Sequence, residues 1–133
     1  WRTNGYGLNS EVLSFLNKQE VVFARAGGSR AYDPLTDHPY LIPSWAPNAD
    51  NKKEILAALE KAHDGKSVIL TFHGVPDVEH PWVTTPLALF KEYLDYLAHN
   101  GYKVIALKDL EAYVNVGEAK NTIVPDLTKE LTN

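Results

Sequence analysis

Cysteine and methionine are both absent from the 133 residues. Without cysteine, the chain has no disulfide scaffold, no thiolate metal site and no cysteine nucleophile. Because it contains no methionine and begins at Trp1, we expect that a preceding segment was removed or was never included. Long apolar runs are lacking as well. None approaches about 18 residues, so no membrane span is predicted.

Positive charge is also sparse. The chain has 13 Lys and Arg against 17 Asp and Glu, which gives a formal net charge of −4. A mildly acidic chain without a basic cluster is a poor candidate for binding nucleic acid or anionic lipid. Hydrophobic residues make up 44% and charged residues 23%, the balance of an ordinary globular domain.

The hydrophobic patterns predict alternating helices and strands. Helices are expected over about 9–18, 50–63, 85–99 and 109–114, and strands over 20–25, 40–42, 66–72 and 103–107. The third helix has a typical start at Thr85-Pro86 and is expected to bury Leu87, Phe90, Leu94 and Leu97. This order is typical of an α/β fold with parallel strands and flanking helices. So few strands suggest part of a larger body, with residues 115–133 as a tail or linker.

His73 is the sharpest candidate for chemistry. It follows the predicted strand 66–72 and precedes Gly74, so it lies at the carboxyl end of a strand, where α/β folds place their sites. The ordinary pKa of histidine, near 6.5, suits general acid or base catalysis. A half-buried histidine that only caps the strand by hydrogen bonding is the alternative.

The loop after His73 contains Asp77, Glu79, His80 and Trp82. With His73, these carboxylates and imidazoles could hold a metal by residue type, but their spacing matches no metal motif. His-Pro pairs often only shape a loop. The flat faces of Trp82 and Trp45 could pack against a sugar ring, or each could cover the rim of the core instead.

The loop over residues 26–45 is rich in polar and aromatic side chains, including Arg30 and Tyr40, as expected of a binding rim. Asp37 and His38 could act as an acid–base or ligand pair. An aspartate just before a turn more often caps backbone amides, and we favour that interpretation. No glycine-rich phosphate loop and no GxSxG nucleophile motif is present.

Three stretches resemble the C-terminal half of the polysaccharide deacetylase domain, the NodB-homology carbohydrate esterases. Residues 1–9, WRTNGYGLN, look like the family's Arg-Pro-Pro-Tyr-Gly segment, although both prolines are missing. Residues 68–73, VILTFH, are similar to the family's late Leu-x-Leu-His strand. Residues 90–110, from Phe90 to Leu110, look like its closing helix, strand and helix. The likeness covers roughly residues 1–114.

The resemblance implies half of a distorted (β/α) barrel and removal of an acetyl group from a polysaccharide or oligosaccharide. It implies that His73 is the catalytic acid and that Arg2 orients a catalytic aspartate. Leu70 would line the acetyl pocket and Trp45 would form an aromatic wall. The other residues expected to bind substrate are Tyr6, Tyr40, Asp77, His80 and Trp82.

The same resemblance implies a divalent metal, most simply zinc, in the complete domain. The family's Asp-Asp pair and His-x-x-x-His ligands precede the segment at which this chain begins, so we expect no metal site in the chain alone. The expected partner is then the missing N-terminal half or a second chain. The alternative is a non-catalytic domain that binds carbohydrate. A secreted, periplasmic or cell-envelope location follows from the family's usual substrates.

Overall fold

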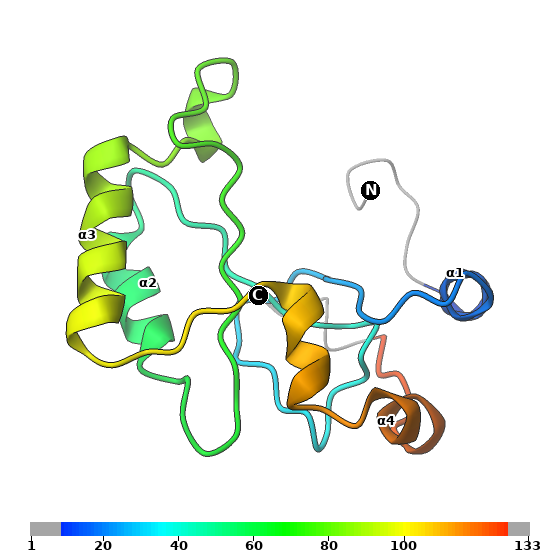
Figure 1. The fold of residues 1–133 in the computed structure, drawn as a ribbon. Coiled ribbons are helices and arrows are strands. Elements are labelled where there is room, and N and C mark those ends of the chain that lie inside the picture. The colour runs from blue at the N-terminus through cyan, green and yellow to red at the C-terminus, as the bar shows by residue number, and fades with distance from the viewer. Residues whose placement is uncertain (1–8, 128–133) are drawn as a thin grey trace.

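The computed structural model describes residues 9–127, shown coloured in Figure 1. Its helical elements in chain order are α1 (Ser10–Lys18), α2 (Lys52–Leu59), the 3-10 helix η2 (Pro81–Val83), α3 (Leu87–His99), the 3-10 helix η3 (Leu107–Ala112) and α4 (Val116–Thr122). In Figure 1, α2 and α3 lie on one side of the extended segments, and α1 and α4 lie on the other. No helix among the described residues is long and apolar enough to cross a membrane.

Three extended segments, which contain Arg25, residues 42–45 and Leu70 in chain order, run parallel but pair only at isolated points. Arg25 forms a parallel bridge with Ile42, and Trp45 forms one with Leu70. The amide of Trp45 donates to Ile69 O at 2.9 Å, so the segment around residues 42–45 lies between the other two. The carboxyl end of the third segment leads directly to His73, which brings this residue to one edge of the fold.

The predicted strands 20–25, 40–42, 66–72 and 103–107 are therefore only partly realised. Among the described residues, the structure contains isolated β-bridges but no continuous β-ladder. Residues 103–106 are exposed and extended. Segment 20–25, expected to be buried on both faces, is half-buried only over residues 21–24, and Glu20 and Arg25 are exposed. One cause is Pro43, which has no N–H to donate and interrupts the middle segment after Ile42. The half-barrel stays a prediction.

Helix α1 matches its predicted range because its capping signal is local. The side chain of Asn9 accepts a hydrogen bond from the Val12 amide at 2.9 Å, as an N-cap residue does. Helix α2 is shorter than predicted and ends at Leu59, and it buries Ile55, Ala58 and Leu59. Gly65, with a φ of 77°, lies in the turn beyond it.

Helix α3 ends at His99 as predicted but begins at Leu87, two residues after the predicted start, and it buries a different face. Leu89 and Tyr93 are buried, whereas Leu87 and Leu94 are 51% and 46% exposed, contrary to the prediction. The reason is that α2 packs against the side that carries Leu89 and Tyr93. The Thr85 hydroxyl does not cap this helix. It is fully buried and donates to Pro47 O at 2.9 Å.

Two hydrophobic clusters hold these elements together. One lies under α2 and α3 and consists of Trp45, Ile55, Ala58, Leu89 and Tyr93. The other joins the first two extended segments to the C-terminal elements and consists of Tyr32, Ile42, Leu110, Val114 and Val116. Since the middle segment supplies Ile42 to one cluster and Trp45 to the other, it connects both halves of the core.

Residues 116–122, expected to belong to a tail or linker, form helix α4. The Asn115 side chain accepts from the Glu118 amide at 3.2 Å and donates to the Glu118 carboxylate at 2.9 Å. Val116 and Ala119 are buried. The ammonium of Lys120 donates to Val21 O at 2.6 Å and lies 4.6 Å from the centre of the Tyr40 ring. Asn115-x-x-Glu118 is a capping signal that could have predicted this helix.

His38 gives the fold a pH dependence. It is buried, and its Nδ1 accepts from the Tyr40 amide at 3.1 Å. Burial, and secondarily the charge of Lys120, lower the pKa of His38. The unfolded chain therefore binds this proton more readily, so stability falls as the pH drops below about 6.5 and continues to fall until the folded-state pKa is reached.

We expect the urea concentration at the unfolding midpoint to decrease when the pH is lowered from 7.5 to 5.0. The decrease should be smaller in His38→Asn, because asparagine keeps a hydrogen-bond acceptor but cannot be protonated. His99→Asn, at an exposed histidine, is the matched control and should keep the wild-type pH dependence. An equal fall in the His38→Asn variant and the wild type would contradict this assignment. Urea titrations of the three proteins at both pH values make the measurement.

Candidate functional site

The candidate site is the loop that begins at His73. Its two ends are held together, because Gly74 forms a parallel bridge with Thr84 and the Thr85 amide donates to Gly74 O at 3.0 Å. Within the loop, the Asp77 amide donates to Thr84 Oγ1 at 2.7 Å. Thr85 in turn is anchored to Pro47 O. The core therefore fixes the loop at its base, and Asp77 is held by its backbone.

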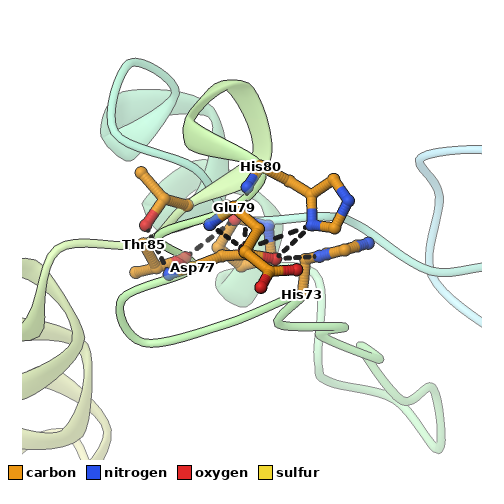
Figure 2. A network of polar contacts seen from close by, with 7 residues as sticks. His73, Asp77, Glu79, His80 and Thr85 are labelled. Carbon is orange, nitrogen blue, oxygen red and sulfur yellow. Dashed lines mark hydrogen bonds and ion pairs between the residues drawn. The ribbon is translucent and has the colours of Figure 1, made fainter.

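The Asp77 carboxylate is the centre of the site (Figure 2). Its Oδ1 accepts from the amides of Glu79 and His80, at 3.1 and 2.9 Å. Its Oδ2 lies 2.5 Å from Nδ1 of His73, and Nδ1 of His80 lies 3.2 Å from both oxygens. One carboxylate thus orients two imidazoles, both contacting it through the same type of nitrogen.

These contacts determine where the protons lie. The hydrogen bond from His73 is the largest cause that lowers the pKa of Asp77 to about 2; burial acts next and in the opposite direction, and the amide and side chain of His80 lower the pKa further. An ionised carboxylate can only accept hydrogen bonds. Nδ1 of each imidazole must therefore carry a proton at neutral pH, which leaves Nε2 to exchange protons with solvent or a ligand.

Exposure increases from the centre of the loop outward. The side chain of Asp77 is 13% exposed, those of His80 and His73 are 45% and 55% exposed, and Trp82 is 71% exposed. The rings of His73 and His80, and of His80 and Trp82, meet edge to face with centres 5.2 and 5.4 Å apart. The arrangement offers an oriented imidazole for proton transfer next to an accessible aromatic face.

His73, Asp77 and His80 can also be considered as metal ligands, since atoms of all three lie within 4.8 Å of one another. Two ligands of one tetrahedral zinc ion lie about 3.3 Å apart, given bonds of about 2.0–2.1 Å. The 2.5 Å contact between His73 Nδ1 and Asp77 Oδ2 is too short for both to be ligands of such an ion. The Asp77 oxygens also already accept backbone N–H groups. A zinc ion therefore does not fit between Asp77 and the Nδ1 atoms of the two histidines. Glu79 is not among the residues that come close enough to share a metal ion.

Gly74 allows the loop to close on Asp77. A Cβ at residue 74 would lie 2.6 Å from Asp77 Cβ and 2.9 Å from its Cα. We expect Gly74→Ala to push Asp77 away from His73 and to lower the free energy of unfolding by about 1–3 kcal/mol. In Gly117→Ala the nearest atom is Asn115 Oδ1 at 3.9 Å, so this control should be neutral or stabilising by up to about 1 kcal/mol.

Urea unfolding of both glycine variants measures these changes, and the ring resonances of His73 report whether the contact with Asp77 persists. Identical midpoints for wild type and Gly74→Ala, together with unchanged His73 resonances, would show that the loop tolerates a Cβ at residue 74.

The structure gives some predicted binding residues other environments. Trp45 is 2% exposed and packs in the cluster under α2 and α3, so it presents no ring face to a sugar. Tyr40 is also 2% exposed, its ring lies under Lys120, and its hydroxyl is 3.3 Å from Asn17 Oδ1. Leu70 is half-buried against the same cluster as Trp45. As placed, the buried rings of Tyr40 and Trp45 cannot contact a substrate.

Other predictions fall elsewhere. Arg2 and Tyr6 lie outside the described residues. Asp77 and His80, expected to bind substrate, contact each other and His73. Asp37 does accept a backbone amide, that of Asp33 at 2.9 Å, and the same oxygen also pairs with Arg30 Nη1 at 2.5 Å.

Sequence reasoning missed the residues that shape the site. The Thr84 hydroxyl accepts from the Asp77 amide, and Gly74 lies so close to Asp77 that a Cβ would not fit, so both residues fix the backbone of Asp77. The consecutive threonines at 84 and 85, directly after the histidine-rich loop, are the only local signal for this role.

No protein-family model, no curated protein and no solved structure matches the chain.

Proposed function

We propose that this chain supplies the proton-transfer part of an enzyme that hydrolyses acetyl groups on glycans, as part of a metal-dependent polysaccharide deacetylase. The observation that carries the proposal is the 2.5 Å contact between His73 Nδ1 and the ionised Asp77, at a histidine whose side chain is 55% exposed. A histidine oriented in this way by a carboxylate is a common form of general acid. The resemblance to deacetylases indicates which reaction that acid serves.

In the proposed reaction, water adds to the acetyl carbon and the bond from that carbon to the leaving nitrogen breaks. The imidazolium of His73 gives its Nε2 proton to the leaving nitrogen, and the products are acetate and a free amine. Asp77 positions the ring and stabilises its positive charge. The resemblance implies that a metal activates the water when the complete domain is assembled, and that the base lies upstream.

Trp82 supports a glycan as the substrate. Its side chain is 71% exposed, and its ring meets the edge of His80, which in turn meets His73. Aromatic rings with one open face bind the apolar face of a sugar. A sugar stacked there would lie next to the proposed acid. The same observation favours the second candidate function, a deacetylase-like domain that binds glycan without catalysis.

The test is acetate release from N-acetylated and O-acetylated oligosaccharides by the full natural protein that contains these residues. Catalysis predicts acetate in a 1:1 ratio with new free amines or hydroxyls, and the 133-residue chain alone should release none. Saturable binding of the oligosaccharide without acetate release by the full protein would overturn catalysis and support the binding function. Absence of both would overturn the proposal.

A further inference from the structure

The proposed reaction uses His73 for proton transfer and assigns no role to the second imidazole of the loop, that of His80. Nδ1 of His80 lies 3.2 Å from both oxygens of Asp77, and its ring centre is 5.2 Å from that of His73. Figure 2 shows that both imidazoles approach Asp77 with one nitrogen and direct the other away from it. The loop therefore turns the Nε2 atoms of both imidazoles away from Asp77, on rings whose centres are 5.2 Å apart.

The Asp77 carboxylate prepares both atoms to bind a cation. Because the Nδ1–H of each ring donates a hydrogen bond to Asp77, the neutral form of each ring carries its free lone pair on Nε2. Histidines that bind metals usually donate their other ring N–H to a carboxylate, which fixes the tautomer and makes the ligating nitrogen more basic. Here one carboxylate accepts such a hydrogen bond from two rings, so the interactions that orient histidine ligands around a metal ion are already present.

We propose that Nε2 of His73 and Nε2 of His80 together bind one Zn²⁺ ion, with Asp77 hydrogen-bonded behind both rings. Imidazole nitrogen is a preferred ligand of zinc, nickel and copper, whereas calcium and magnesium prefer oxygen. This site differs from the arrangement excluded above, because the ion lies on the outer side of the rings and not between them and Asp77. With two ligands from the chain, water completes the coordination and the affinity is modest.

The proposed site would regulate the proposed reaction. Nε2 of His73 is the atom that gives its proton to the leaving group, and an atom bound to zinc cannot do so. Zinc in excess of any catalytic requirement should therefore inhibit acetate release. This consequence rests on the proposed function, whereas binding of the ion to the loop does not.

The experiment titrates ZnCl₂ into the 133-residue chain and follows the ring ¹H–¹⁵N resonances of its histidines, with calorimetry for the stoichiometry. We expect one saturable ion per chain and the largest shifts at Nε2 of His73 and His80. His80→Ala and His73→Ala should each lose saturable binding. Asp77→Asn should weaken binding by about 10–100-fold, as expected for the loss of a carboxylate that supports ligating histidines.

His63→Ala is the matched control, because His63 is an exposed histidine with Nδ1 2.7 Å from Asp64 but without a second imidazole on that carboxylate. It should bind zinc like the wild type. The proposal is overturned if no saturable binding occurs up to millimolar zinc, if His80→Ala binds normally, if the shifts occur at Nδ1, or if Asp77→Asn keeps full affinity. Zinc binding without inhibition of acetate release would instead contradict the role of His73 in catalysis.

Discussion

Replacement of His73 with alanine is expected to lower kcat/KM for acetate release by the full natural protein by about 10²–10⁴-fold, the usual contribution of a general acid. The effect should fall on kcat, since the ring acts on the leaving group and its removal leaves the glycan contacts of Trp82 in place. Because the His73 side chain is 55% exposed, the urea midpoint should change little. Steady-state kinetics and urea unfolding of the same preparation separate the two effects.

Asp77→Asn should lower kcat with little change in KM, because the amide no longer holds Nδ1–H of His73 with a negative charge. His63→Ala is the control, since His63 also contacts a neighbouring carboxylate but lies outside the loop. A His73→Ala protein with wild-type kcat would contradict the proposed acid. Equal losses of kcat in His63→Ala would show that the assay reports a general defect.

Trp45 and Trp82 should respond in opposite ways to truncation. Trp45 is 2% exposed in the core, so Trp45→Ala is expected to cost about 3–5 kcal/mol in free energy of unfolding. Trp82 is 71% exposed, so Trp82→Ala should change stability by less than about 0.5 kcal/mol. Loss of the stacking face should weaken oligosaccharide binding about 2- to 10-fold, as expected for an aromatic contact of about 0.5–1.5 kcal/mol.

Urea unfolding measures the first effect, and calorimetric titration with an N-acetylated oligosaccharide measures the second. Trp82→Phe is the matched control, since it keeps a flat ring and should retain most of the affinity. If Trp82→Ala binds the oligosaccharide as tightly as the wild type, Trp82 is not the glycan platform. A stable Trp45→Ala protein would contradict the packing of the cluster under α2 and α3.

The sequence predicts well those features that depend on neighbouring residues. Asn9 caps α1, and Gly101, with a φ of 70°, ends the run of α3, so both helices lie where their patterns place them. Burial could not be predicted in the same way. The 3.6-residue period fits more than one face of α3, and only the position of α2 decides that Leu89 and Tyr93 point inward. Composition likewise cannot distinguish Trp45 from Trp82.

The candidate site was predictable in its members but not in its geometry. His73 and Asp77 are four residues apart in an irregular loop, where spacing does not determine whether side chains meet. They meet because Asp77 accepts from the His80 amide and its own amide donates to Thr84. Those interactions depend on the closure of the loop at Gly74, which no periodic pattern in the sequence encodes.

The hydrogen bond from Lys120 to the carbonyl of Val21 has a consequence for the order of folding. The two residues are 99 positions apart, yet one ammonium joins the first extended segment to the last helix described. Contacts between residues so distant in sequence require closure of a long loop and form slowly compared with local helices. We therefore expect helices such as α1 and α3 to form early and the docking of α4 on Val21 and Tyr40 to form late.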